Sequence, residues 1–129
     1  MSESDPSERP VYIRKSLDAA LTALNYGPEL SETHMILGDV LKTINLNSAL
    51  SIKELNKAIR LNPNNAEAYV FLSYALMERR NFKEAEQNLQ KAKVLDPLSP
   101  FMKFAWGSFY EYTRNTEKLA GFPQGFDTP

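Results

Sequence analysis

Side chains that could support catalysis or bind a metal are scarce in this chain of 129 residues. The chain has one histidine, His34, and no cysteine, whereas a metal site needs several His, Cys or carboxylate ligands that converge. Nucleophilic catalysis needs a base beside the nucleophile, and the sequence indicates no such pair. The five glycines are too dispersed for a phosphate-binding loop. The chain is therefore predicted to be no enzyme and to hold no metal or cofactor.

The charged residues also exclude two classes of partner. The net charge is −1, and the longest cluster of adjacent arginines is Arg79-Arg80, so binding to nucleic acid is not predicted. Glu84 and Glu86 have the spacing of an ordinary solvated helix face. No apolar run approaches the roughly 18 residues of a membrane span, so membrane insertion is not predicted. The lack of cysteine leaves the compartment open.

The elements that would position a binding site are clearest between Ala66 and Ser99. One face of a first predicted helix carries residues at i, i+3, i+4 and i+7: Tyr69, Leu72, Ser73 and Leu76. Asn81 interrupts this helix, and Glu84 follows three residues later as a candidate capping partner. A second predicted helix places small and apolar residues on one face: Ala85, Leu89 and Ala92. Pro97 ends it, because proline cannot continue a helix.

This arrangement resembles the tetratricopeptide repeat, in which an aromatic, a leucine, a small residue and a large apolar residue precede a spaced alanine and a final proline. The resemblance covers about residues 11–114. It implies an α-solenoid whose first helices line a concave side, and a role in binding other proteins. The phrases LNPNNAEAY and LDPLSP are also similar to repeat regions of bacterial winged-helix regulators and adenylate cyclases. No winged-helix or cyclase domain is present, so their activities are not implied.

Three prolines mark the repeat along the chain. Pro28, Pro63 and Pro97 are 35 and 34 residues apart. Each follows an alanine by five residues: Ala23, Ala58 and Ala92. The sequence therefore predicts an all-α solenoid of about five helices plus a C-terminal stub. The predicted units are a disordered tail (1–10), a half repeat (11–28), two repeats (31–65 and 66–99), a half repeat (100–114) and an irregular tail (115–129).

Two segments depart from the regular repeat. One extra residue lies in the turn between Ile44 and Ser51, and Ser51 with Glu54 forms a candidate capping box, which predicts a late start for the following helix. After the last predicted helix, residues 115–117 have the pattern of a turn and a helix start. His34 occupies the repeat position that Tyr69 fills in the next unit, so a packing role is predicted for it.

The resemblance implies a partner-binding groove lined by first-helix residues that point away from the packed helix pair. These are Met35, Asp39, Lys42, Val70, Tyr74, Met77, Glu78, Phe101, Phe104, Ser108 and Glu111. The lining is apolar and aromatic, and methionines adapt to irregular partners, so an apolar or amphipathic segment of another protein is the predicted ligand. A second interpretation stays open for Phe101 and Phe104, which this chain's own tail could cover with Leu119, Phe122 and Phe126.

The C-terminal end of the predicted solenoid is incomplete. Its third unit has a first helix and at most a stub of the second, which predicts that three aromatic residues are left uncovered by a helix: Trp106, Phe109 and Tyr110. Solenoids normally need a polar capping helix at such an end. The candidate covers are the tail 118–129, a second copy of the chain in a homodimer, or further repeats. The alternative function is accordingly a self-association or sensory module of a larger bacterial signalling or transcription regulator.

Overall fold

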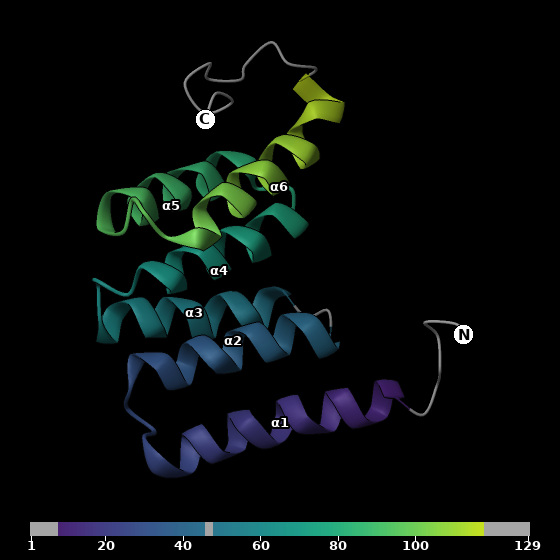
Figure 1. Ribbon diagram of the computed structural model, residues 1–129, viewed down its shortest axis with the longest axis vertical. Helices are drawn as coiled ribbons and strands as arrows, with labels where there is room; N and C mark the ends of the chain where they lie inside the picture. The colour runs from purple at the N-terminus through teal and green to yellow at the C-terminus, as the bar shows by residue number, and fades with distance from the viewer. Residues whose placement is uncertain (1–7, 46–47, 118–129) are drawn as a thin grey trace.

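The computed structural model describes residues 8–45 and 48–117, which form six helices and no strand. They are α1 (Glu8–Tyr26), α2 (Ser31–Asn45), α3 (Ser48–Leu61), α4 (Ala66–Glu78), α5 (Phe82–Leu95) and α6 (Pro100–Glu117). The helices stack in chain order, with α1 at one end and α5 and α6 at the other (Figure 1). This is the predicted all-α solenoid. It has six helices rather than about five. Each of the two full repeats contributes two helices, and each of the two half repeats contributes one.

The helices alternate between the two positions of a repeat. Within residues 8–45 and 48–117, the helices pair as α2–α3 and α4–α5, while α1 takes the place of a second helix and α6 that of a first helix. The helices α1, α3 and α5 each end two residues before a proline: Pro28, Pro63 and Pro97. Proline lacks the N–H that would continue the helix, which explains why these three helices end at the same place in the repeat.

The core is centred on α4, which contacts α2, α3, α5 and α6. Eight residues of α4 are buried: Ala68, Tyr69, Val70, Leu72, Ser73, Ala75, Leu76 and Met77. A helix that is apolar on nearly all sides is stable only when neighbouring elements cover all of those sides. The core therefore extends along the stack on both sides of α4, with Leu55 of α3 and Leu89 of α5 both fully buried.

The close contact between α2 and α3 depends on a glycine and a serine. A Cβ atom on Gly38 would lie 2.6 Å from Cγ of Leu55, so only glycine allows this separation of the helices. The Ser51 hydroxyl donates a hydrogen bond of 2.7 Å to the Gly38 carbonyl oxygen. The predicted capping role of Ser51 is therefore wrong. Helix α3 already begins at Ser48, and Ser51 is a buried residue inside the helix.

Two further helix boundaries and one predicted capping contact differ from expectation. Helix α1 begins at Glu8 rather than at residue 11, since Pro10 lies in the first turn, where a missing N–H costs nothing. Asn81 is the N-cap residue of α5, but its amide donates to the Glu84 carboxylate at 3.3 Å instead of capping the backbone. Helix α6 continues through residues 115–117, where a turn was predicted, because no glycine or proline interrupts it there. The predictions for residues 1–7 and 118–129 fall outside the described residues.

Candidate functional site

The first helices α2, α4 and α6 lie next to one another and bring several predicted groove residues together. The Nζ atom of Lys42 on α2 is 3.4 Å from Oε2 of Glu78 on α4 and 6.0 Å from the centre of the Tyr74 ring. The Tyr74 ring in turn meets the Phe104 ring of α6 edge to face, with 6.4 Å between centroids. These contacts form a continuous surface across three repeats. We call it the first-helix surface: Asp39, Lys42, Tyr74, Glu78, Phe101 and Phe104.

The aromatic part of the first-helix surface is accessible. Phe104 is 68% exposed and Phe101, one helical turn before it, is 42% exposed. Tyr74 is half-buried between Phe104 and Phe71, which lies 6.4 Å from it on the same helix. Burying a large apolar side chain is worth about 1.5–3 kcal/mol, so these rings can contribute substantially to binding an apolar ligand.

The polar part of the surface combines both signs of charge. Lys42 lies between the Glu78 carboxylate and Asp39. Burial raises the pKa of Asp39 above its usual range, and the nearby Lys42 ammonium lowers it in part. Burial also raises the pKa of Tyr74, so its hydroxyl stays neutral at physiological pH. The pair of Lys42 and Glu78 is partly exposed, where such pairs contribute about 0–1 kcal/mol to stability. Both side chains can therefore leave this pair and bind charged groups of a ligand instead.

Three predicted groove residues are not on this surface. Met35, Val70 and Met77 are all buried in the core. The cause is the packing of first helices against each other, because α4 lies between α2 and α6 and its flanks are covered on both sides. Ser108 is partly buried, and Glu111 is exposed. The burial of Val70 and Met77 could have been predicted from the uncharged run 68–77, because such a run is typical of a helix buried on all sides.

His34 has a structural position. Its Nδ1 atom is 2.7 Å from Oε1 of Glu54 on α3, and its Nε2 atom is 2.7 Å from the Pro28 carbonyl oxygen. A carbonyl oxygen can only accept a hydrogen bond, so Nε2 carries a hydrogen. The buried ring thus links the turn before α2 to helix α3. Within residues 8–45 and 48–117, no three His, Cys, Asp or Glu side chains are grouped as a metal site would require.

The three C-terminal aromatic residues, predicted to be left uncovered by a second helix of their own unit, are largely enclosed in the structure. Trp106 and Phe109 are buried and Tyr110 is partly buried. Helix α5 provides part of the cover, since the Phe82 ring meets the Phe109 ring edge to face at 6.5 Å. What remains open beside α6 is a hollow of about 720 Å³. Its lining is Lys93, Pro97, Leu98, Ser99, Pro100, Met102, Lys103, Trp106, Gly107 and Tyr110.

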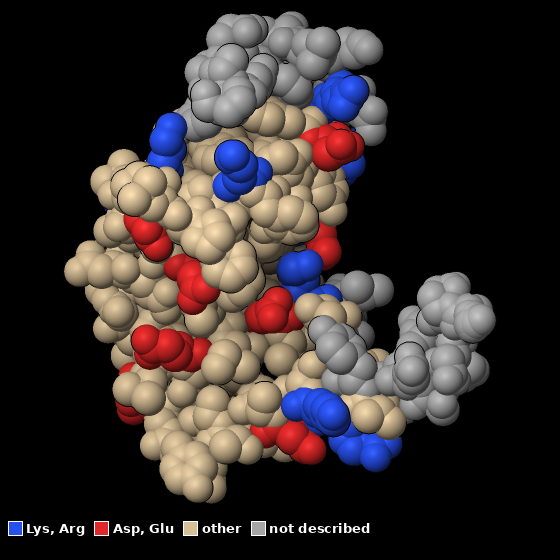
Figure 2. Space-filling model, viewed as in Figure 1, with Lys and Arg blue, Asp and Glu red and all other residues tan. Residues whose placement is uncertain are grey.

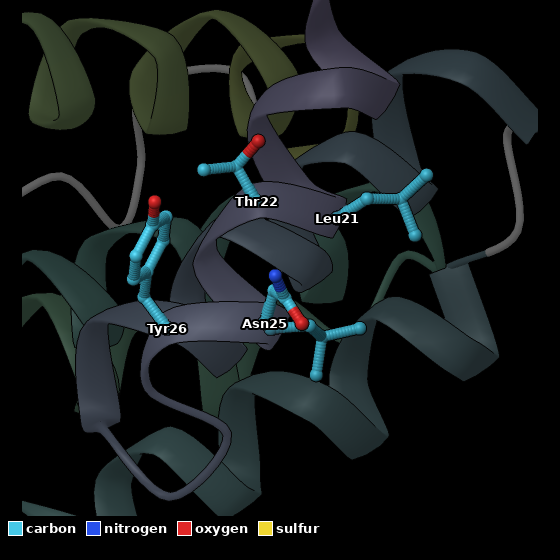
Figure 3. A pocket seen from close by; sticks show the side chains of 5 residues that line it. Leu21, Thr22, Asn25 and Tyr26 are labelled. Carbon is cyan, nitrogen blue, oxygen red and sulfur yellow. The ribbon is translucent and has the colours of Figure 1, made fainter.

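A second hollow, of about 630 Å³, lies at the C-terminal end of α1 (Figure 3). Its lining comes from α1 alone: Leu21, Thr22, Leu24, Asn25 and Tyr26. Sequence reasoning found neither hollow, because each depends on how the chain packs around α1 and α6. The face shown in Figure 2 carries both acidic and basic side chains amid much neutral surface. Of the helices in the described part of the chain, none is long and apolar enough to cross a membrane.

Comparison with known proteins identifies one repeat directly. Residues 66–97 match the family model described as Tetratricopeptide repeat, and this match spans α4, α5 and the turn as far as Pro97. No curated protein matches the chain. The pair α2–α3 repeats the arrangement of α4–α5, and the half repeats α1 and α6 extend it at both ends. Residues 66–97 are therefore a tetratricopeptide repeat, a kind of repeat that serves generally as a scaffold for protein–protein interaction.

Proposed function

We propose that this protein binds an amphipathic segment of a partner protein along its first-helix surface. The observation that carries the proposal is the unbroken series of contacts from Lys42 through Tyr74 to Phe104, which joins three successive first helices. Phe104 is too exposed to serve chiefly as core. Exposed aromatic rings beside charged groups are a common composition for the centre and rim of a protein interface.

The chemistry of this surface specifies the partner in outline. Phe101 and Phe104 offer apolar contact for large side chains of the partner, while Tyr74 adds a ring and a neutral hydroxyl. Lys42 and Glu78 offer one charge of each sign on the adjacent helices. A segment with two or three apolar side chains on one side and polar groups of both signs on the other would satisfy both parts of the surface.

Selection of peptides by display on the full chain tests this proposal. Selected peptides should bind the Phe104→Ala variant at least tenfold more weakly than the parent protein, because the variant loses exposed aromatic contact area. Gln90→Ala, at an exposed position of α5, is the matched control and should bind like the parent protein. Thermal melts of both variants should match the parent protein.

Three results would decide against the first-helix surface. One is peptides that bind the Phe104 variant as tightly as the parent protein. Another is loss of binding in the Gln90 control. The third is selected peptides that carry no apolar residues. Tyr74→Phe offers a finer test, since it keeps the ring and removes only the hydroxyl. If the ring is what contacts the partner, this variant should retain binding.

A further inference from the structure

The hollow beside α6 lies on the side of this helix that corresponds to the α3 side of α2. Gly107 is 34 residues after Ser73, which is 35 residues after Gly38, so the three take the same repeat position. A Cβ atom on Gly38 would lie 2.6 Å from Cγ of Leu55 in α3, whereas one on Gly107 would meet no atom of the described residues within 4 Å. Gly107 belongs to the lining of the hollow of about 720 Å³. The described residues therefore leave open a side of α6 that is closely packed in α2.

The hollow combines apolar surface with positive charge. Most of its lining is apolar or aromatic: Pro97, Leu98, Pro100, Met102, Trp106 and Tyr110. Lys93 and Lys103 add two positive charges, and the residues that line the hollow include no acidic one. Leu98 is 91% exposed, so much of the apolar surface is open to a ligand. This lining fits a segment that carries a large apolar side chain next to a carboxylate.

We propose that residues 122–127 of this chain, with the sequence Phe-Pro-Gln-Gly-Phe-Asp, occupy the hollow beside α6. This segment places the ring of Phe126 directly before the carboxylate of Asp127. The ring matches the apolar lining around Trp106, and the carboxylate matches the charge of Lys103. Phe122, four residues earlier, offers a second ring to the same hollow.

The repeat position of Lys103 supports a carboxylate as its partner. Lys103 is 34 residues after Tyr69, which is 35 residues after His34. In α2, Nδ1 of His34 is 2.7 Å from Oε1 of Glu54 on α3. Asp127 beside Lys103 would repeat, at the same position of the repeat, this contact between a side-chain nitrogen and a carboxylate.

The chain is long enough to return from the end of α6 to the hollow. Helix α6 ends at Glu117, eleven residues after Trp106, which is about 16 Å along the helix axis. Phe126 follows nine residues later, and nine extended residues span up to about 30 Å. The glycines and the proline in residues 121–125 favour a change of chain direction over a continued helix.

Attachment to α6 favours this segment over a segment of a separate molecule. A short flexible connection gives a tethered ligand an effective concentration on the order of millimolar. A separate segment of the same composition would have to reach that concentration to compete equally. The contact would therefore form within one molecule and close the hollow to other ligands.

A nitroxide spin label tests this contact in the full chain. The chain has no cysteine and one tryptophan, so Thr128→Cys accepts the label at one site and Trp106 gives one indole N–H signal in the NMR spectrum. The label should abolish this signal, and reduction of the nitroxide should restore it. Thr22→Cys, at an exposed position of α1 at the other end of the stack (Figure 1), is the control site and should leave the signal intact when labelled.

Two substitutions in the chain labelled at position 128 separate docking from attachment to α6 alone. Phe126→Ala removes the apolar contact and should restore most of the lost indole signal. Lys103→Gln removes the charge contact and should restore a smaller part, because exposed ion pairs are weak. Lys91→Gln, at an exposed position of α5, is the matched control and should leave the signal abolished. Circular dichroism equal to that of the parent protein shows that the helices stay folded.

Three results would overturn the proposal. If the signal stays abolished in the Phe126→Ala variant, attachment to α6 alone brings the label near Trp106. If spin-labelled molecules abolish the signal of unlabelled, isotope-enriched molecules in a mixture, a second copy occupies the hollow. If the signal survives in the chain labelled at position 128, residues 122–127 lie elsewhere and the hollow is left to another protein.

Discussion

Alanine at two glycine positions of the same repeat register should have opposite effects on stability. Glycine inside a helix costs about 0.5–1 kcal/mol relative to alanine, chiefly through backbone entropy. Both Gly38→Ala and Gly107→Ala recover this amount. At Gly107 nothing opposes it, because the added methyl group has no neighbour within 4 Å. We therefore expect Gly107→Ala to raise the free energy of unfolding by about 0.5–1 kcal/mol.

At Gly38 the same methyl group would be 2.6 Å from Cγ of Leu55 and 3.2 Å from the Ser51 carbonyl oxygen. Leu55 is fully buried, so it cannot move aside, and overpacking of this kind costs about 1–3 kcal/mol. Separating α2 from α3 also lengthens the hydrogen bond from Ser51 to Gly38, which contributes about 1 kcal/mol. After subtraction of the entropy gain, Gly38→Ala should lower the free energy of unfolding by about 1–3 kcal/mol.

Urea unfolding at low protein concentration, followed by circular dichroism, measures both effects. With a typical dependence of about 1–3 kcal/mol per molar urea, the midpoint should rise by roughly 0.5 M for Gly107→Ala and fall by roughly 1 M for Gly38→Ala. Shifts of the same sign in the two variants would refute the reasoning. They would mean that the face of α6 beside Gly107 is as closely covered as that of α2.

Three further changes test other parts of the structure. Arg80, the residue after the C-cap of α4, has a φ of 63°, a left-handed conformation that residues with a side chain adopt at a cost. Arg80→Gly should therefore raise the free energy of unfolding by about 0.5–1 kcal/mol despite the loss of its contact with the Phe82 ring, and a lower urea midpoint would contradict this. Burial raises the pKa of Asp39 above its ordinary value of 3.8, so the folded state favours the protonated acid and loses stability as pH rises through that raised pKa. Asp39→Asn should therefore be more stable than the parent protein in urea melts at pH 7, with the difference shrinking toward pH 4, and a constant difference would exclude this cause. Leu89→Ala removes a fully buried side chain and should lower the free energy of unfolding by about 2–5 kcal/mol. Val94→Ala, at a position 78% exposed on the same helix, should change it by less than about 0.5 kcal/mol.

Local patterns sufficed for most of the fold. Proline spacing and a 3.6-residue period predicted the all-helical repeat pattern, because helix ends and apolar stripes depend on short stretches of sequence. The resemblance to the tetratricopeptide repeat put Lys42, Tyr74 and Phe104 on one predicted surface, and in the structure Tyr74 contacts both of the others.

The errors arose where exposure depends on a neighbouring repeat. Val70 and Met77 were predicted to point away from the partner helix of their own repeat into an open groove, but both are buried in α4, which also packs on the adjacent first helices. Ser51 looked like a helix cap because its local spacing fits one, while its actual partner is the Gly38 carbonyl on another helix. Contacts of this kind follow from how repeats stack and are not visible in any single helix.

The central position of α4 has a consequence for how the molecule opens. Helix α4 packs on four other helices, whereas α1 packs on α2 alone among the contacts of comparable extent. Stability in a stack of repeats is approximately a sum of units and nearest-neighbour interfaces, so the units with fewest interfaces open first. Deuterium should therefore enter the amides of α1 earliest and those of α4 last, in a graded series along the chain. The terminal helix can then separate and reattach while the rest of the stack keeps its native structure.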